Sequence, residues 1–109
     1  MPASGWYGCA LRMVLLIQSR RNFIVQNKLG LHATPAALIV RIVNKYPGIE
    51  VWVRRGDDQV NGKSIMGLMM LEASYRTSLL FIVEGGTFPG QKALLDEIDD
   101  LFANKFYED

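Results

Sequence analysis

The sequence predicts an α+β fold in which helices pack on one face of a mostly antiparallel sheet. Segments that alternate apolar and polar residues are interleaved with segments of helical periodicity, in the order β-α-β-β-α-β-α. The two middle strands are joined by a short turn at residues 56–58, which indicates a hairpin. The length of 109 residues, 50% of them hydrophobic, leaves room for one compact domain. The other face of the sheet is then expected to be solvated or covered by a partner.

The first predicted strand covers residues 22–26, which alternate between apolar and polar. The helix that follows opens at Pro35, since proline is favoured in the first turn, and Thr34 or a neighbour is expected to cap it. Pro47 and Gly48 end this helix. Its apolar face consists of Leu38, Ile39, Ile42, Val43 and Tyr46.

The hairpin is expected to pair residues 49–54 with a short return strand at 59–61. A short helix over residues 65–71 follows and is apolar on nearly every side. The unbroken apolar run 79–83 predicts a strand buried on both faces, which places it inside the sheet. The last predicted helix has about four turns. Its apolar stripe consists of Leu94, Leu95, Ile98, Leu101, Phe102 and Phe106.

Residues 1–20 differ in composition from the rest and are expected to form an N-terminal extension, with the folded domain over residues 21–109. The apolar run 13–17 is far shorter than the ~20 residues that a membrane span needs. Positive charge mainly follows this run, whereas a secretory signal carries it in front. The remaining interpretations are a flexible extension or a start codon assigned too early, with Met13 as the true start.

Charge and cysteine content exclude several classes of site. The 12 basic and 11 acidic residues give a net charge of +1, so no general attraction to nucleic acid or to a membrane surface is expected. Cys9 is the only cysteine and therefore forms no internal disulfide. One cysteine and one histidine are too few for an ordinary zinc site. We expect no metal, no cofactor and a reducing compartment.

His32, the only histidine, lies just before the first predicted helix. Unpaired N–H groups and the helix dipole make such a position an anion site. The same field disfavours an imidazolium, which leaves one ring nitrogen free as a nucleophile near pH 7. A phosphoryl group on that nitrogen would lie among the N–H donors, and Gly30 would let an incoming phosphate approach closely. The plainer alternative is a polar surface histidine that helps to cap the helix.

Two motifs resemble the HPr proteins of the bacterial phosphotransferase system. Residues 30–36, Gly-Leu-His-Ala-Thr-Pro-Ala, match that family's phosphohistidine signature, Gly-Leu-His-Ala-Arg-Pro-Ala, at six of seven positions. Residues 63–72 resemble its regulatory serine segment. The resemblance covers residues 21–109. It implies an open-faced β-sandwich, with a four-stranded antiparallel sheet and three helices on one face.

The resemblance implies a cytoplasmic, monomeric phosphocarrier rather than an enzyme. His32 would accept a phosphoryl group on Nδ1 from phospho-enzyme I, which draws it from phosphoenolpyruvate, and pass it to A-domains of sugar permeases or to a regulatory homologue. Residues 27–32 and 105–109 look more like the nitrogen-related branch of the family. Residues 63–67 look more like the sugar branch, so both branches stay open.

Thr34 departs from the family, which has an arginine there that can contact phosphate through its guanidinium. Threonine keeps one hydroxyl as a phosphate contact and loses the charge. Either Lys28 or another nearby cation substitutes, or transfer is slower. The alternative function is an HPr-like regulatory binding module, controlled through Ser64, with little or no phosphotransfer.

Ser64 precedes the short helix, where serine is a favoured cap. By the resemblance it would also be phosphorylated by an HPr kinase/phosphorylase, which would add about two negative charges. Flexible methionines suit a surface that fits several partners. The docking surface expected beside His32 consists of Gly30, Ile65, Met66 and Met69.

Overall fold

The structure, a computed structural model, describes residues 17–108 and confirms the predicted order of strands and helices. A short turn at Lys105–Tyr107 follows the last helix. The elements are β1 (Gln18–Ile24), α2 (Ala33–Val43), β2 (Glu50–Arg55), β3 (Asp58–Asn61), α3 (Ile65–Met70), β4 (Ser78–Glu84) and α4 (Phe88–Ala103).

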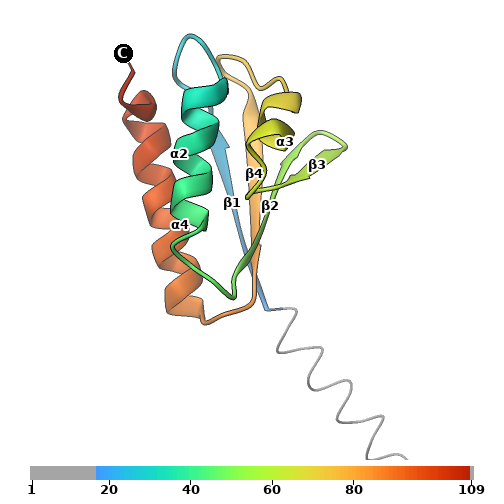
Figure 1. Cartoon of the computed structure of the whole chain (residues 1–109), viewed down its shortest axis with the longest axis vertical. Coiled ribbons are helices and arrows are strands. Elements are labelled where there is room, and N and C mark those ends of the chain that lie inside the picture. Colours follow the sequence, from blue (N-terminus) through green and yellow to red (C-terminus); the bar gives the residue numbers. More distant parts are fainter. Residues whose placement is uncertain (1–16, 109) are drawn as a thin grey trace, which may run out of the picture.

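The four strands form one antiparallel sheet in the order β1-β4-β2-β3 (Figure 1). β4 lies between β1 and β2, as its apolar run predicts. Phe81 faces the helices and is fully buried, while Ile82 on the opposite face is only 3% exposed. β2 and β3 form the predicted hairpin, with Val53 opposite Val60.

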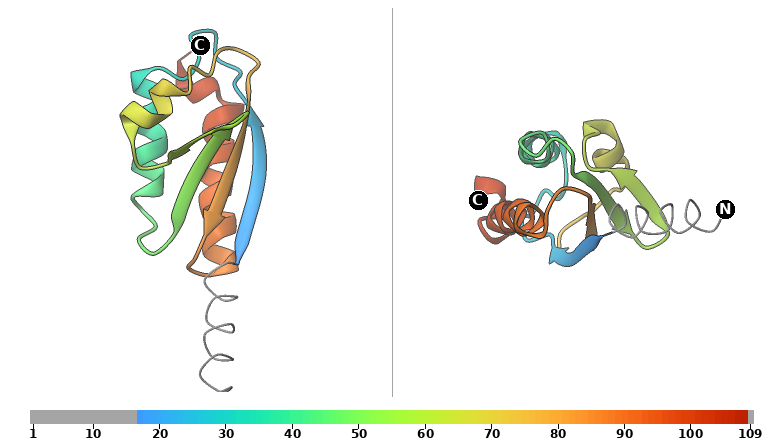
Figure 2. Two further views of the ribbon diagram at one scale, coloured as in Figure 1. Left: turned by 90° about the vertical axis from the view of Figure 1, so that its right-hand side faces the viewer. Right: turned by 90° about the horizontal axis from the view of Figure 1, so that it is seen from below.

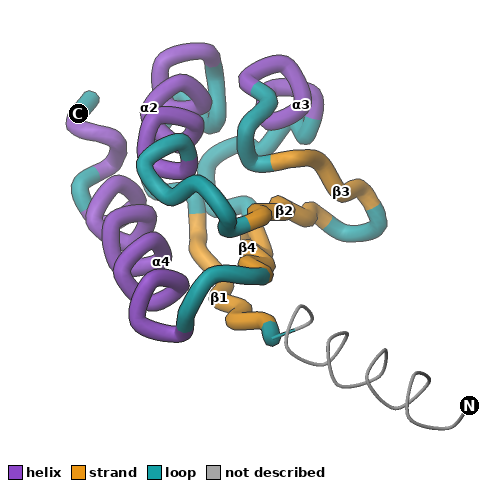
Figure 3. The backbone as a smooth tube through the Cα atoms, turned by 60° about the horizontal axis from the view of Figure 1, so that its bottom comes forward, coloured by secondary structure: helices purple, strands orange, loops and turns teal. Residues whose placement is uncertain are grey.

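All three helices cover the same face of the sheet (Figure 2), so the predicted open-faced sandwich is confirmed. α4 packs along β1, α2 lies between α4 and α3, and α3 sits over the end of the sheet that contains β3 (Figure 3). The chain leaves β1 at the end of the molecule where α2 begins and α4 finishes (Figure 1). The loop that contains His32 and the segment that follows α4 therefore meet there.

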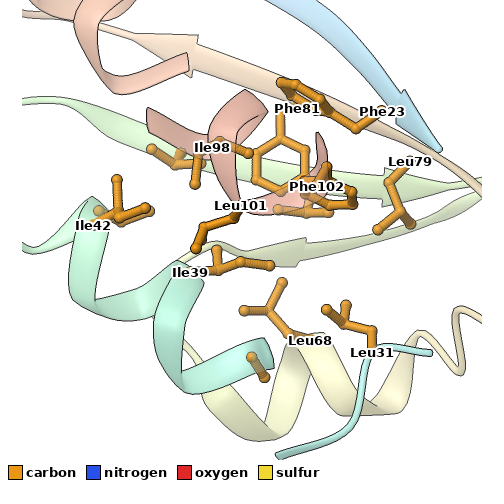
Figure 4. Packing of buried hydrophobic residues seen from close by; sticks show 14 of the residues in the cluster. Phe23, Leu31, Ile39, Ile42, Leu68, Leu79, Phe81, Ile98, Leu101 and Phe102 are labelled. Atoms are coloured by element: carbon orange, nitrogen blue, oxygen red, sulfur yellow. The ribbon is translucent and has the colours of Figure 1, made fainter. Parts of the chain in front are cut away.

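The core between sheet and helices contains a cluster of aromatic rings (Figure 4). Phe23 of β1 stacks on Phe102 of α4, with ring centroids 5.0 Å apart, and Phe81 of β4 meets Phe102 edge-on at 5.8 Å. Phe106 extends the cluster, with its ring 4.8 Å from that of Phe102. Aromatic pairs of this kind add about 0.5–1.5 kcal/mol to the effect of burial alone. The cluster joins the sheet, α4 and the turn that follows α4.

The first strand and the first helix both begin earlier in the chain than predicted. β1 starts at Gln18, within the segment 1–20 that was expected to be an extension, because residues 18–24 pair with 78–84 of β4. Residues 1–16, which the extension also includes, lie outside the described residues. The expected cap was Thr34 or a neighbour. α2 starts at Ala33 with His32 as its N-cap, so Thr34 lies inside the first turn and is not the cap. A proline fits anywhere in the first turn, and its position therefore does not identify the first helical residue.

α4 ends at Ala103, so Phe106 does not belong to the helix on which its apolar spacing places it. Lys105, Phe106 and Tyr107 instead have φ angles of 53°, 55° and 59°, in the left-handed region. This turn reverses the chain and buries Phe106 to 2% exposure. The spacing identified a core residue correctly and assigned it to the wrong element.

Candidate functional site

His32 is the N-cap of α2 and has extended backbone angles, φ −90° and ψ −168°. The loop before it is tied to the loop that precedes β4, since the Leu31 N–H donates to the Ala73 carbonyl at 2.8 Å. The His32 side chain makes no capping bond to the helix and keeps 35% of its surface exposed. Its ring is therefore accessible while its backbone is fixed.

Within residues 17–108, two N–H groups at the start of α2, beside His32, have no hydrogen-bond acceptor. The first N–H groups of a helix have no carbonyl one turn earlier to accept them. Pro35 has no N–H, and the Ala36 N–H already donates to the His32 carbonyl at 3.0 Å. Ala33 and Thr34 are left as the donors, at the positive end of the helix dipole. The start of α2 therefore has the backbone donors that the predicted anion site would use, and the site itself stays a prediction.

A carboxylate that the sequence analysis did not single out contacts the ring. Nε2 of His32 lies 2.6 Å from Oε2 of Glu108, which is 16% exposed. The two residues are 76 positions apart, and the left-handed turn after α4 brings them together. Periodicity gives no sign of such a turn, because none of its residues is glycine. Among the described residues, no hydrogen bond involves Nδ1.

A hollow of 320 Å³ opens beside His32 and connects it with α3. Its wall includes Leu29, Met69 and Glu72. Met69 and Glu72 also line a second hollow, of 540 Å³, together with Ile65, Met66 and Met70. The exposed fractions are 42% for Ile65, 73% for Met66, 41% for Met69 and 72% for Met70. These four residues are called the α3 surface below.

The α3 surface differs from the docking surface expected from the sequence in two members. Met70 belongs to it, although the sequence analysis left it out. Gly30 does not, because it is buried, and the expectation that it leaves space for a phosphate is wrong. Gly30 has a φ of 74°, and a Cβ there would lie 2.6 Å from the Ala73 carbonyl oxygen. Glycine is required by this close approach of two loops.

Ser64 caps α3, as the pattern predicts. Its Oγ accepts a hydrogen bond from the Gly67 N–H at 2.9 Å. Leu68 and Leu71 point into the core, so the apolar residues of this short helix divide between core and surface. Ser64 lines neither the hollow beside His32 nor the hollow along α3.

Cations surround Tyr75, on the loop that packs against the His32 loop. The Arg76 guanidinium lies 5.1 Å from the centre of the Tyr75 ring. Its hydrogen bond and charge, with weaker contributions from Lys105 and Lys28, lower the pKa of the Tyr75 hydroxyl. Thr34 is exposed and carries no charge. Positive charge at this end of the molecule therefore comes from residues outside α2.

Two further kinds of feature are absent from residues 17–108. No group of three or more histidine, cysteine, aspartate or glutamate side chains is placed to hold a metal ion there. None of the helices in the same range has the length and apolar character to cross a membrane.

Comparison with known proteins identifies the family. The model of the "PTS HPr component phosphorylation site" matches residues 19–104. This chain belongs to the HPr family. The HPr phosphocarrier of Treponema pallidum is 41% identical over 85 residues, which span 78% of this chain and 92% of that protein. An HPr structure from Thermoanaerobacter tengcongensis superimposes with a TM-score of 0.74 at 34% identity, and covers 84% of this chain and 98% of that one.

The HPr family also includes relatives with other names. The HPr-like protein Crh of Halalkalibacterium halodurans is 41% identical over 61 residues, 56% of this chain and 71% of that protein. The sequence prediction of an HPr-type phosphocarrier, as opposed to an enzyme with its own substrate, is confirmed at the level of the family.

Proposed function

We propose that this HPr protein accepts a phosphoryl group on Nδ1 of His32 from phospho-enzyme I and passes it to A-domains of sugar permeases or to a nitrogen-related homologue. The observation that carries the proposal is the free pair of N–H donors at Ala33 and Thr34, directly after an exposed histidine. We further propose that the protein works in the cytoplasm as a monomer, where both partners reach the same surface.

The geometry supports transfer through Nδ1. Nε2 is engaged by Glu108, so Nδ1 is the ring nitrogen left to attack phosphorus. The bond from phosphorus to the donor atom breaks as the bond to Nδ1 forms, and the donor atom keeps the electron pair. The transferred oxygens then accept from the Ala33 and Thr34 N–H groups. Transfer to the next partner reverses these steps and restores the free ring.

The α3 surface supports docking of several partners. Its methionine side chains are flexible and apolar, and they adapt to differently shaped surfaces. Met69 lines both hollows, so a partner seated on α3 is next to His32. We infer that Lys28, Arg76 and Lys105, the cations near Tyr75, favour an acidic partner.

A second candidate function is regulation by binding, with little phosphotransfer. It is favoured by the replacement of the family's arginine by Thr34 and by the 41% sequence identity to the HPr-like protein Crh over 61 residues. In this case control would act through Ser64, whose phosphorylation by a kinase of the HPr kinase/phosphorylase type adds about two negative charges beside the α3 surface. That charge would disfavour an acidic partner in either function.

The experiment follows acid-labile, base-stable label on the protein after incubation with enzyme I and labelled phosphoenolpyruvate. Wild type is compared with His32→Ala and Thr34→Arg. We expect label in wild type, none in His32→Ala and a rate about tenfold higher in Thr34→Arg, because a guanidinium stabilises the transferring oxygens. Absence of label in wild type, with label in Thr34→Arg, would exclude the carrier and favour the regulator.

A further inference from the structure

We propose that Glu108 and Asn27 are positioning residues that hold the His32 ring in the tautomer with its proton on Nε2. That tautomer leaves the lone pair of Nδ1 available for attack on phosphorus. The inference deepens the proposed function and rests on it for its catalytic meaning. The positioning itself is a property of the unphosphorylated protein and can be measured without any partner.

The contact between Glu108 and His32 is short and directional. At 2.6 Å, the distance from Oε2 to Nε2 is that of a charge-assisted hydrogen bond. A carboxylate can only accept, so the bond requires a proton on Nε2. Glu108 is 16% exposed, and water competes little for its oxygens. In the neutral ring, one nitrogen carries the proton and the other is the nucleophile.

Asn27 holds the second oxygen of Glu108. Its Nδ2 donates to Oε1 of Glu108 and to the Gly30 carbonyl, both at 2.7 Å. A flipped amide would direct its own oxygen at two acceptors, so these contacts fix its orientation. Asn27 is fully buried, and within residues 17–108 its Oδ1 has no hydrogen-bond partner. A buried amide that leaves an acceptor unpaired is unfavourable for folding and indicates another use for the residue.

The chain reaches this arrangement through an unfavourable backbone. Lys105, Phe106 and Tyr107 all have left-handed φ angles, which side chains other than glycine rarely adopt. The turn is held by the buried Phe106 ring and by a bond from the Tyr107 N–H to the Asn104 carbonyl at 2.8 Å. Strained backbone directly before Glu108 is consistent with a geometry kept for function.

The carboxylate also matches the charge that transfer creates. When Nδ1 bonds to phosphorus, the ring keeps its Nε2 proton and becomes positively charged. Glu108 then faces a cation through the same hydrogen bond and stabilises it, as a carboxylate does behind the histidine of a serine-protease triad. Transfer onward returns the electron pair to Nδ1 and the ring to neutrality. No proton has to leave the site in either direction.

Glu108→Gln provides a sharp test because Asn27 dictates how the new amide points. The Nδ2 of Asn27 still needs an acceptor, so it binds the amide oxygen. The amide NH₂ then faces Nε2 and donates to it. This reverses the hydrogen bond and moves the ring proton to Nδ1. Glu72→Gln is the matched control, since Glu72 lines the same hollow without a hydrogen bond to the ring in the part of the chain described.

The measurement is the two-bond ¹H–¹⁵N NMR spectrum of protein labelled with ¹⁵N-histidine, recorded at alkaline pH. His32 is the only histidine, so one ring gives the whole signal. We expect mainly the Nε2–H form in wild type and in Glu72→Gln, and mainly the Nδ1–H form in Glu108→Gln. An Nδ1–H ring in wild type, or a spectrum unchanged in Glu108→Gln, would overturn the proposal.

The transfer assay with enzyme I separates this proposal from the proposed function. Labelling of His32 is expected to slow at least tenfold in Glu108→Gln, since loss of the right tautomer costs about 10⁴-fold in a buried protease site. It is expected to stay unchanged in Glu50→Gln, which removes an exposed carboxylate on β2 that lines neither hollow. Wild type that takes up no label but shows the Glu108-dependent tautomer would contradict the carrier function and leave the positioning intact. Normal labelling in Glu108→Gln with a reversed tautomer would contradict the role of positioning in transfer.

Discussion

At the scale of single residues, Gly30 belongs to a motif associated with function, but its contacts in the structure give it a structural role. It lies two residues before His32, and its expected use was to admit a phosphate. The structure instead gives Gly30 a φ of 74° and leaves no space for a Cβ, which would lie 2.6 Å from the Ala73 carbonyl oxygen. The glycine therefore sets the position of the His32 loop on the loop before β4.

Gly30→Ala is expected to lower the free energy of unfolding by about 3 kcal/mol. A left-handed non-glycine residue costs roughly 1–2 kcal/mol, and displacement of a backbone carbonyl adds to this. Gly56→Ala is the matched control, since Gly56 also has a positive φ, of 59°, but nothing lies within 4 Å of its new Cβ. It should cost only about 1 kcal/mol. Urea unfolding of both variants checks this, and equal losses would contradict the contact with Ala73.

The sequence predicted part of the site at this scale. His32 could be found because its role depends on a local feature, the start of the helix that follows it. Glu108 and Asn27 could not, because their contact joins positions 81 apart through a left-handed turn. A turn built without glycine leaves no signature in residue type.

At the scale of elements, the sequence predicted the type of each one and was less accurate about where each begins. The central position of β4 follows from an apolar run that leaves no face for water. In and directly after α3, Leu68 and Leu71 are buried, whereas Met66 and Met70 are exposed. Helix geometry explains this division only once the direction of the core is known. The start of α2 was misplaced because proline tolerates several first-turn positions.

The pairing of α2 with α4 predicts a pH-dependent stability. Glu97 of α4 accepts hydrogen bonds from Lys45 and Tyr46, which follow α2. The bond from Lys45, then that from Tyr46, lowers the pKa of Glu97 below its ordinary 4.5. The same contact raises the pKa of Tyr46 to about 12. Folding therefore favours the ionised carboxylate, and its contribution is complete above pH 4.5 and lost as the pH falls through the lowered pKa.

Glu97→Gln is accordingly expected to lower the free energy of unfolding by about 1 kcal/mol at pH 7, a value reduced for partial exposure of the pair. As the pH falls through the lowered pKa of Glu97, the wild-type carboxylate takes up a proton, so the difference should be smaller at pH 2 than at pH 7. Asp99→Asn on the same helix is the control, since Asp99 is exposed and makes no side-chain hydrogen bond within the described chain. Urea titrations at both pH values test this. A difference as large at pH 2 as at pH 7 would contradict the electrostatic origin.

At the scale of the whole molecule, the core and the site share one support. The aromatic cluster runs from β1 and β4 through Phe102 to Phe106. Glu108 lies only two residues after Phe106 in the chain. Figure 4 shows the rings of Phe23, Phe81 and Phe102 together between sheet and helices. The position of the carboxylate behind His32 thus depends on the packing of an apolar cluster.

Phe106→Ala tests this dependence. Removal of a ring that is 2% exposed is expected to lower the free energy of unfolding by about 3 kcal/mol and to release the turn that holds Glu108. The ¹⁵N spectrum of His32 should then show loss of the preference for the Nε2–H tautomer. Leu94→Ala, at a fully buried position earlier in α4, should cost about the same stability and leave the tautomer unchanged. If Leu94→Ala shifts the tautomer equally, general loosening of the fold is the cause and Phe106 has no specific part in holding the site.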